Sequence, residues 1–76
     1  MKELIEFIAK QLVDSPDDVR VSEEEQRGRV IVRLEVAEDD YGKVIGRGGR
    51  TANALRLVVK AAAVKEDRRV LVDIVD

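Results

Sequence analysis

The chain has 76 residues, 39% of them charged, and its 16 acidic and 14 basic side chains give a net charge of −2. This length indicates one domain, and the absence of cysteine and histidine excludes disulfide bonds and the common zinc sites. No stretch has the character of a secretory signal or a membrane span, so we expect a cytoplasmic protein that does not contact membranes.

The first half of the chain predicts a helix followed by two strands. Residues 2–14 carry apolar side chains with the spacing of an amphipathic helix, and Pro16 ends it because proline lacks an amide proton. Residues 19–26 begin with apolar–polar alternation, which predicts a short strand, and 27–28 predict a turn. Residues 29–37 alternate regularly between apolar and polar side chains, which is the clearest strand pattern in the chain.

The second half predicts two helical segments and a last strand. Asp39 or Asp40 is suited to be the N-cap of a short helix that begins near Tyr41. Glycines at 46–49 must interrupt this helix, and residues 50–65 form an alanine-rich helical segment with one apolar face.

A polar connection at 66–69 and a β-branched run at 70–75 complete the chain. The whole order predicts one α+β domain, residues 1–76, with a three-stranded sheet covered by helices on one face.

Charge is unevenly distributed along the chain. Residues 1–40 hold six basic and twelve acidic side chains, whereas residues 41–64 hold five basic side chains and no acidic one. Residues 65–76 hold three basic and four acidic side chains. This asymmetry is typical of a cationic zone that attracts an anionic partner. A solvated basic helix face with acids near it in space would give the same pattern.

The glycine-rich segment at 46–49 differs from the nucleotide-binding phosphate loops. A nucleotide-binding P-loop fails because position 47 is arginine, and the dinucleotide fingerprint fails because position 51 is threonine and the motif follows a helix. A plain turn between helices needs one glycine and no arginine. A G-x-x-G loop without Cβ atoms can approach a sugar-phosphate strand closely, and the amides that begin the next helix attract anions.

The segment "VIGRGGRTANAL" resembles the core signature of the KH domain, in which V-I-G-x-x-G precedes an aliphatic helix. The predicted order is similar to the type II form, α-β-β-α-(GXXG)-α-β, over the whole chain, and the likeness is greatest to the small bacterial single-domain KH proteins of the KhpA family. The resemblance implies non-catalytic binding of single-stranded RNA, with phosphates at the loop and bases on an aliphatic floor.

On this resemblance, ten residues are candidates for RNA binding: Lys43, Val44, Ile45, Gly46, Arg47, Gly48, Gly49, Arg50, Thr51 and Asn53. Lys43 and Arg50 flank the loop and are expected to contact phosphate. Thr51 either hydrogen-bonds a phosphate or begins the helix, and Asn53 is placed to read a base.

Val44, Ile45 and Ala52 are candidates for the floor of the RNA groove, although aliphatic residues beside a loop also belong to cores. The strand at 29–37 is expected to form the opposite wall, with Arg33 either reaching RNA or remaining solvated. Arg56 and Lys60 lie on one helix face and either contact RNA or pair with acids. Gly48 stands where many KH loops carry a polar residue, which we expect to remove one contact and loosen the loop.

The resemblance also implies partners. It suggests a homodimer or a heteromer with a larger KH-containing protein similar to KhpB, and a role in RNA-chaperone-like regulation linked to cell-wall and cell-shape control. An alternative is a KH-fold protein-interaction or dimerisation module with only residual RNA binding, and single-stranded DNA is a possible ligand. We expect no catalytic residue, cofactor or metal, because the chain has no histidine or cysteine and its two serines have no evident base.

Overall fold

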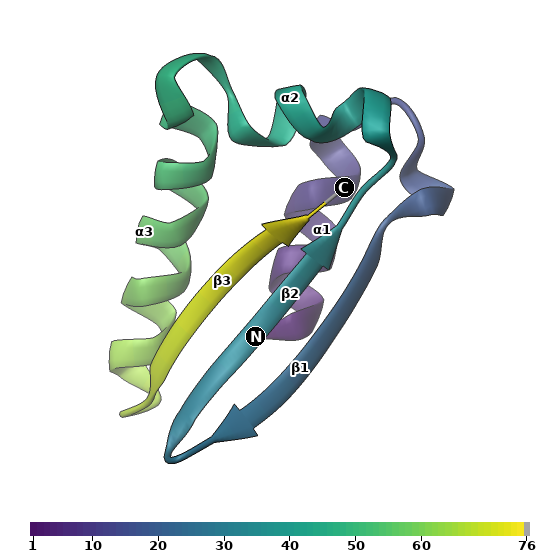
Figure 1. Ribbon diagram of the computed structural model, residues 1–76. Helices are drawn as coiled ribbons and strands as arrows, with labels where there is room; N and C mark the ends of the chain where they lie inside the picture. The colour runs from purple at the N-terminus through teal and green to yellow at the C-terminus, as the bar shows by residue number, and fades with distance from the viewer. Residues whose placement is uncertain (76) are drawn as a thin grey trace.

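The computed structural model describes residues 1–75. Helix α1 is followed by two strands, two further helices and a last strand, which confirms the predicted α+β order, with the sheet covered by helices on one face (Figure 1). The elements are α1 (Lys2–Leu12), β1 (Arg20–Gln26), β2 (Arg29–Glu35), α2 (Tyr41–Ile45), α3 (Arg50–Lys65) and β3 (Arg69–Val75). None of the helices in these residues combines the length and the apolar character needed to cross a membrane.

The sheet has the strand order β1-β2-β3. β1 and β2 form an antiparallel hairpin, and its two-residue turn uses Arg27 and Gly28, both with positive φ, as right-twisted hairpins prefer. β3 runs parallel to β2, so the chain must cross over through α2 and α3 to reach it. Because the hairpin occupies one edge of β2, β3 takes the other edge, where α3 packs beside it.

The core lies between the sheet and the helices, and the alternation in β2 explains its position. Val30, Val32 and Leu34 are buried, whereas Arg29, Arg33 and Glu35 project from the open face. The buried residues that meet them from the helices and the other strands are Ile5, Ala9, Val19, Val36, Val44, Ala52, Leu55, Val59, Ala63, Val72 and Ile74. Small alanines on α3 allow that helix to approach the sheet closely.

The boundaries differ from the sequence prediction at four places, and the smallest difference is that the first strand begins at Arg20, one residue later than predicted. The first helix ends at Leu12, because Val13 is already extended (φ −99°, ψ 159°) ahead of the turn that Pro16 begins. The second strand ends at Glu35, although the Val36 amide still donates to the Val75 carbonyl at 3.2 Å. The last strand begins at Arg69, inside the predicted polar connection, since a polar side chain is tolerated on the open face of the sheet.

Asp40 has a different role from the predicted helix cap. It immediately precedes α2, but its side chain makes no capping hydrogen bond to that helix. Its carboxyl oxygens instead accept hydrogen bonds from the amides of Asp14 at 3.1 Å and Ser15 at 3.0 Å. Asp40 is only 2% exposed, so this buried side chain joins the segment after α1 to the start of α2.

Candidate nucleic-acid interface

The loop between α2 and α3 has three glycines with positive φ. Gly46 has φ +77°, and a Cβ atom there would lie 2.3 Å from Thr51 Oγ1 and 2.8 Å from the Thr51 backbone nitrogen. Gly48 (φ +64°, ψ 19°) and Gly49 (φ +78°, ψ 12°) are left-handed. Three of the four loop positions therefore favour glycine, which explains the composition of the loop. At Gly48, glycine fits the backbone that the loop adopts, and the expected loosening of the loop stays a prediction.

The hydrogen bonds of the loop leave part of its backbone free for a ligand. The Gly46 amide donates to the Gly42 carbonyl at 2.8 Å, and the Gly49 amide donates to the Gly46 carbonyl at 3.1 Å. Neither bond uses the amides of Arg47 and Gly48. The N-cap of α3 is Gly49, which has no side chain to cap the first turn. The positive end of a 16-residue helix and free loop amides thus meet at one place, where an anion is favoured.

The basic side chains around the loop fall into two classes. Arg47 and Arg50 are exposed, and neither lies within 4.0 Å of a carboxylate in residues 1–75. Lys43 instead donates to Asp14 and lies 3.8 Å from Asp40 Oδ1. The hydrogen bond to Asp14 raises the pKa of Lys43 above its ordinary 10.5, with the charges of neighbouring carboxylates adding to the effect against a desolvation penalty.

The expected aliphatic floor is mostly core. Val44 and Ala52 are 0% and 1% exposed, and Leu55 is buried with them. Of the two alternatives left open for Val44 and Ala52, their burial favours the core, because both side chains belong to the hydrophobic cluster between the helices and the sheet. Ile45 is half-buried and packs against this core. These core contacts of α2 and α3 fix the two ends of the loop.

A groove lies between α3 and β3, with a volume of about 350 Å³. Its lining residues are Arg56, Lys60, Ala63, Val64, Arg68, Arg69, Val70, Leu71 and Val72. The strand beside α3 is therefore β3, which corrects the expectation that residues 29–37 form this wall. Arg33 projects from the open face of β2, where its Nε lies 3.6 Å from Asp73 Oδ2.

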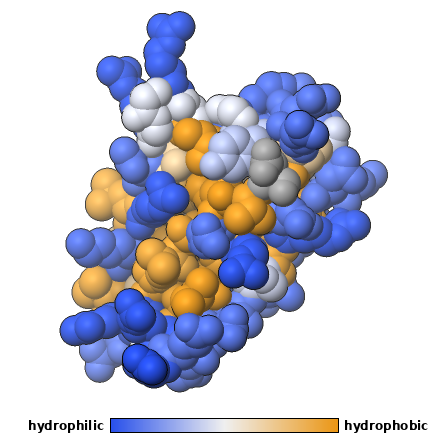
Figure 2. Space-filling view, in the orientation of Figure 1, coloured by the Kyte–Doolittle hydropathy of each residue, from blue (hydrophilic) through white to orange (hydrophobic). Residues whose placement is uncertain are grey.

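Side chains on one face of α3 connect the loop to the groove. Asn53, Arg56, Lys60 and Val64 follow one another at spacings of three or four residues, so they form one stripe along the helix. A Cβ atom on Gly49 would lie 3.8 Å from Asn53 Nδ2, which places Asn53 at the junction. Figure 2 shows apolar surface gathered over α3 and β3, bounded by hydrophilic residues. The exposed apolar side chains of these two elements include Leu57 and Val64 on α3 and Leu71 on β3, which are 69%, 71% and 53% exposed.

The structure thus brings most of the candidates together and adds others. Arg47, Gly48, Gly49, Arg50 and Asn53 surround one end of α3, whereas Thr51 is half-buried against Gly46. Arg56 and Lys60 line the groove and have no carboxylate within 4.0 Å among residues 1–75.

Sequence reasoning missed Arg68 and Arg69 because they lie in a segment with a net negative charge. The alternation of the last strand was the available signal, since it places Arg69 on the same face as Leu71.

Comparison with known proteins agrees with this geometry. The family model for the KH domain of KhpA and KhpB matches residues 2–74. An RNA-binding protein KhpA from Halalkalibacterium halodurans is 59% identical, with 100% of both chains covered. Another from Clostridium acetobutylicum is 57% identical over 99% of this chain and 100% of the relative. A third, from Bacillus subtilis, is 46% identical over 100% of this chain and 94% of the relative. The chain belongs to the KhpA/KhpB KH-domain family.

Proposed function

We propose that this chain binds single-stranded RNA, without catalysis, through the loop at 46–49 and the adjoining groove between α3 and β3. The observation that carries the proposal is the meeting of free loop amides, an uncapped helix start and two unpaired arginines at one end of a partly apolar groove. The names of the relatives, RNA-binding protein KhpA, support the choice of RNA as the ligand.

The loop is suited to contact phosphates and the groove to contact bases. A phosphate at the loop would accept hydrogen bonds from the amides of Arg47 and Gly48, with the guanidinium groups of Arg47 and Arg50 adding charge. Lys43 contributes if phosphate displaces Asp14. Bases that leave the loop would pass Asn53, whose amide can pair with a base edge, and rest on the exposed side chains of Val64 and Leu71. This arrangement suits unpaired bases, because a duplex hides its base edges.

The charge of the chain sets the strength of binding. With three phosphates neutralised at the loop, the logarithm of the binding constant should fall with the logarithm of salt concentration with a slope of about −2. Affinity from one such site is modest, so useful binding requires several sites acting together. We propose that a second copy, or a larger KH chain similar to KhpB, supplies the others in the cytoplasm, with RNA-chaperone-like regulation of transcripts for cell-wall and cell-shape control as the outcome.

Fluorescence anisotropy with a labelled single-stranded RNA tests the proposal. The variant Arg47→Asp with Gly48→Asp places acids in the loop, and aspartate tolerates the left-handed conformation at position 48. The control Lys2→Asp with Ser22→Asp changes the net charge equally at exposed positions away from the loop. We expect the loop variant to lose at least about tenfold in affinity, since removing phosphate contacts weakens binding steeply at low salt, while the control binds like the wild type. Equal binding by all three proteins contradicts the proposal.

A second candidate is a protein-interaction module, which the exposed apolar side chains favour. Phe7 and Leu57 are 65% and 69% exposed, on different helices. If dimerisation is the main function, Leu57→Gln dissociates the assembly in sedimentation velocity and the loop variant has no defect in binding RNA. If RNA binding is the main function, the loop variant is the impaired one.

A further inference from the structure

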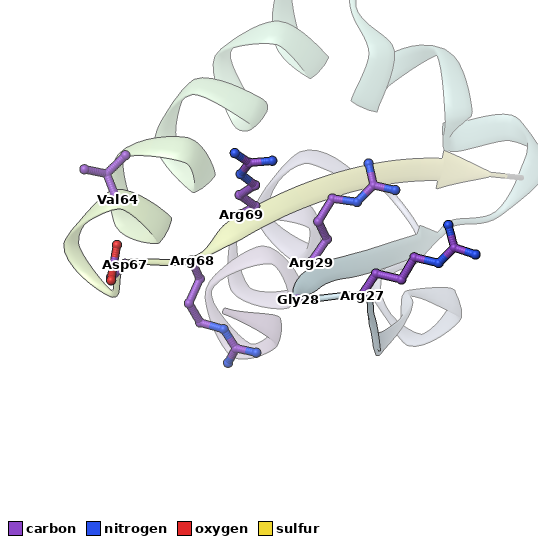
Figure 3. A pocket seen from close by; sticks show the side chains of 7 residues that line it. All are labelled: Arg27, Gly28, Arg29, Val64, Asp67, Arg68 and Arg69. Carbon is purple, nitrogen blue, oxygen red and sulfur yellow. The ribbon is translucent and has the colours of Figure 1, made fainter.

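Four arginines gather at the end of the sheet remote from the glycine loop. A hollow of about 590 Å³ is lined there by Arg27, Gly28, Arg29, Val64, Asp67, Arg68 and Arg69. The β1–β2 turn and the α3–β3 turn, far apart in sequence, both contribute to it. Figure 3 shows the side chains of Arg27, Arg29 and Arg69 on one side of the sheet, whereas Arg68 extends to the other side.

Three of these arginines are not neutralised within the described chain. Arg29 and Arg69 are direct partners in the parallel register of β2 and β3, and like charges on adjacent strands repel each other. Arg68 pairs with Glu25 at 3.2 Å. Arg27, Arg29 and Arg69 have no carboxylate within 4.0 Å among residues 1–75, and Asp67 is the one acid that lines the hollow. A bound anion would relieve this repulsion.

This hollow, here called the arginine hollow, adjoins the groove between α3 and β3. Val64, Arg68 and Arg69 line both, so the groove between α3 and β3 opens at its far end onto the arginines. The 16 residues of α3 separate this end from the glycine loop by roughly 24 Å at 1.5 Å per residue. A strand held at the loop and running through the groove would therefore arrive at the hollow.

We propose that the arginine hollow, formed by Arg27, Arg29 and Arg69, binds backbone phosphates of the RNA strand as it leaves the groove. The ligand is the same strand that the loop holds, so this inference rests on the proposed function. Guanidinium groups suit the task because they bind phosphate oxygens in a bidentate manner. The consequence is a footprint longer than the roughly four nucleotides that a GXXG loop clamps.

The test compares two RNA lengths on three proteins by fluorescence anisotropy, at several salt concentrations. The hollow variant is Arg27→Asn, Arg29→Gln and Arg69→Gln, with asparagine at position 27 because φ is +52° there. The charge-matched control is Lys2→Gln, Lys10→Gln and Arg20→Gln, and Arg69→Gln alone serves as a milder second variant. The probes are a labelled oligouridine tetranucleotide and one of about twelve nucleotides, which extends well beyond the loop's clamp.

For the longer RNA, we expect the logarithm of the binding constant to fall with the logarithm of salt concentration with a slope of about −4 for the wild type and the control, and about −2 for the hollow variant. The difference arises because each lost phosphate contact changes this slope by about 0.7. The hollow variant should lose at least about tenfold in affinity for the longer RNA at about 50 mM salt, and Arg69→Gln alone a smaller part of it. The tetranucleotide reaches little beyond the loop, so the hollow variant should lose much less affinity for it than for the longer RNA, although Arg69 also lines the groove.

If the hollow variant keeps the affinity and slope of the wild type on the longer RNA, the inference is overturned while the proposed function stands; the hollow is then left for an acidic protein partner. If the wild type binds neither RNA, both fail together.

Discussion

Gly46 is the residue at which the loop tolerates no side chain. The backbone angles of Gly48 and Gly49 favour glycine without excluding other residues, because the nearest atom to a Cβ at position 49 is 3.8 Å away and none lies within 4 Å at position 48. At Gly46 the backbone angle and the space are both restricted, since Thr51 fills the place of a Cβ. The first turn of α3 thereby packs against the residue that follows α2, which restricts the direction of the loop amides.

We predict that Gly46→Ala destabilises the fold more than Gly28→Ala. Both residues have positive φ, which costs an alanine about 1–2 kcal/mol, and ψ of 167° places Gly46 in a region that is nearly restricted to glycine. Only Gly46→Ala adds a clash with the Thr51 backbone, because no atom lies within 4 Å of a Cβ at Gly28. Urea unfolding should show a further loss of about 1 kcal/mol or more for Gly46→Ala. Equal losses in the two variants would mean that the loop relaxes without cost.

The Asp14 carboxylate competes with an RNA phosphate for the ammonium group of Lys43. Its raised pKa means that the folded state holds its proton more tightly, so the associated stability is present below 10.5 and is lost as the pH rises through the raised value. Across neutral pH, Lys43 is therefore a cation engaged by Asp14. The pairing reduces its availability to phosphate.

We predict that Asp14→Asn strengthens RNA binding and lowers the pKa of Lys43 toward 10.5. The variant removes the main partner of the lysine ammonium and one negative charge near the loop. The control Asp17→Asn removes the same charge from an exposed position with no ion pair to Lys43. Anisotropy should show a gain of about twofold to threefold for Asp14→Asn over this control, as expected of one exposed ion pair. NMR titration of the lysine side chains follows the pKa, and an unchanged Lys43 would contradict the pairing.

At the scale of elements, Asp40 positions α2. This short helix has five residues and a single buried one, Val44, so its own packing is slight. The hydrogen bonds from the Asp14 and Ser15 amides to the Asp40 carboxyl connect it to the segment after α1. The glycine loop follows directly, so the position of the loop depends on this connection.

We predict that Asp40→Ala destabilises the protein by about 1–3 kcal/mol, because two amides lose their acceptor in a partly buried site. Asp39→Ala changes a neighbouring exposed acid and should shift stability by no more than about 0.5 kcal/mol. Chemical denaturation measures both. A small effect of Asp40→Ala would show that α2 is held by Val44 and the core alone.

The elements also show how far sequence reasoning reaches. The alternation in residues 29–37 and the glycines at 46–49 are local patterns, and both predicted the correct structure. The wall of the groove depends on which edge of β2 receives β3, which is a long-range property that no local pattern specifies. The role of Val44 was ambiguous for a related reason, because a valine beside a loop can belong either to the core or to a binding surface. Only the packing of the helices, which buries Val44, distinguishes these two roles.

At the scale of the whole molecule, an acidic chain carries a row of basic side chains, here called the basic track, that runs from the glycine loop along α3 to the arginine hollow. Arg47 and Arg50 begin it at the loop, Arg56 and Lys60 continue it along α3, and the arginine hollow ends it. The three parts come from segments that are separate in sequence, so the net charge of −2 hides them. Residues 1–40 hold twelve of the 16 acidic side chains, so the negative charge lies mainly outside the loop and α3.

We predict that the chain prefers single-stranded RNA to duplex RNA of the same composition by at least about tenfold. A groove of about 350 Å³ has room for unstacked bases but not for an A-form helix, whose base edges are buried in its narrow major groove. Competition of unlabelled single strands and duplexes against a labelled single strand measures the ratio. Equal competition would indicate binding of phosphate charge alone.

The central claim is that RNA contacts the loop and the α3–β3 groove. An NMR titration of the backbone amides with short single-stranded RNA tests it most directly, because it reports the place of binding even when affinity is low. We expect shifts centred on residues 43–60 and 68–72 that disappear in the folded Arg47→Asp, Gly48→Asp variant. Shifts that are absent, or that gather on β1 or the outer face of α1, would contradict it and favour a chain that acts through a protein partner.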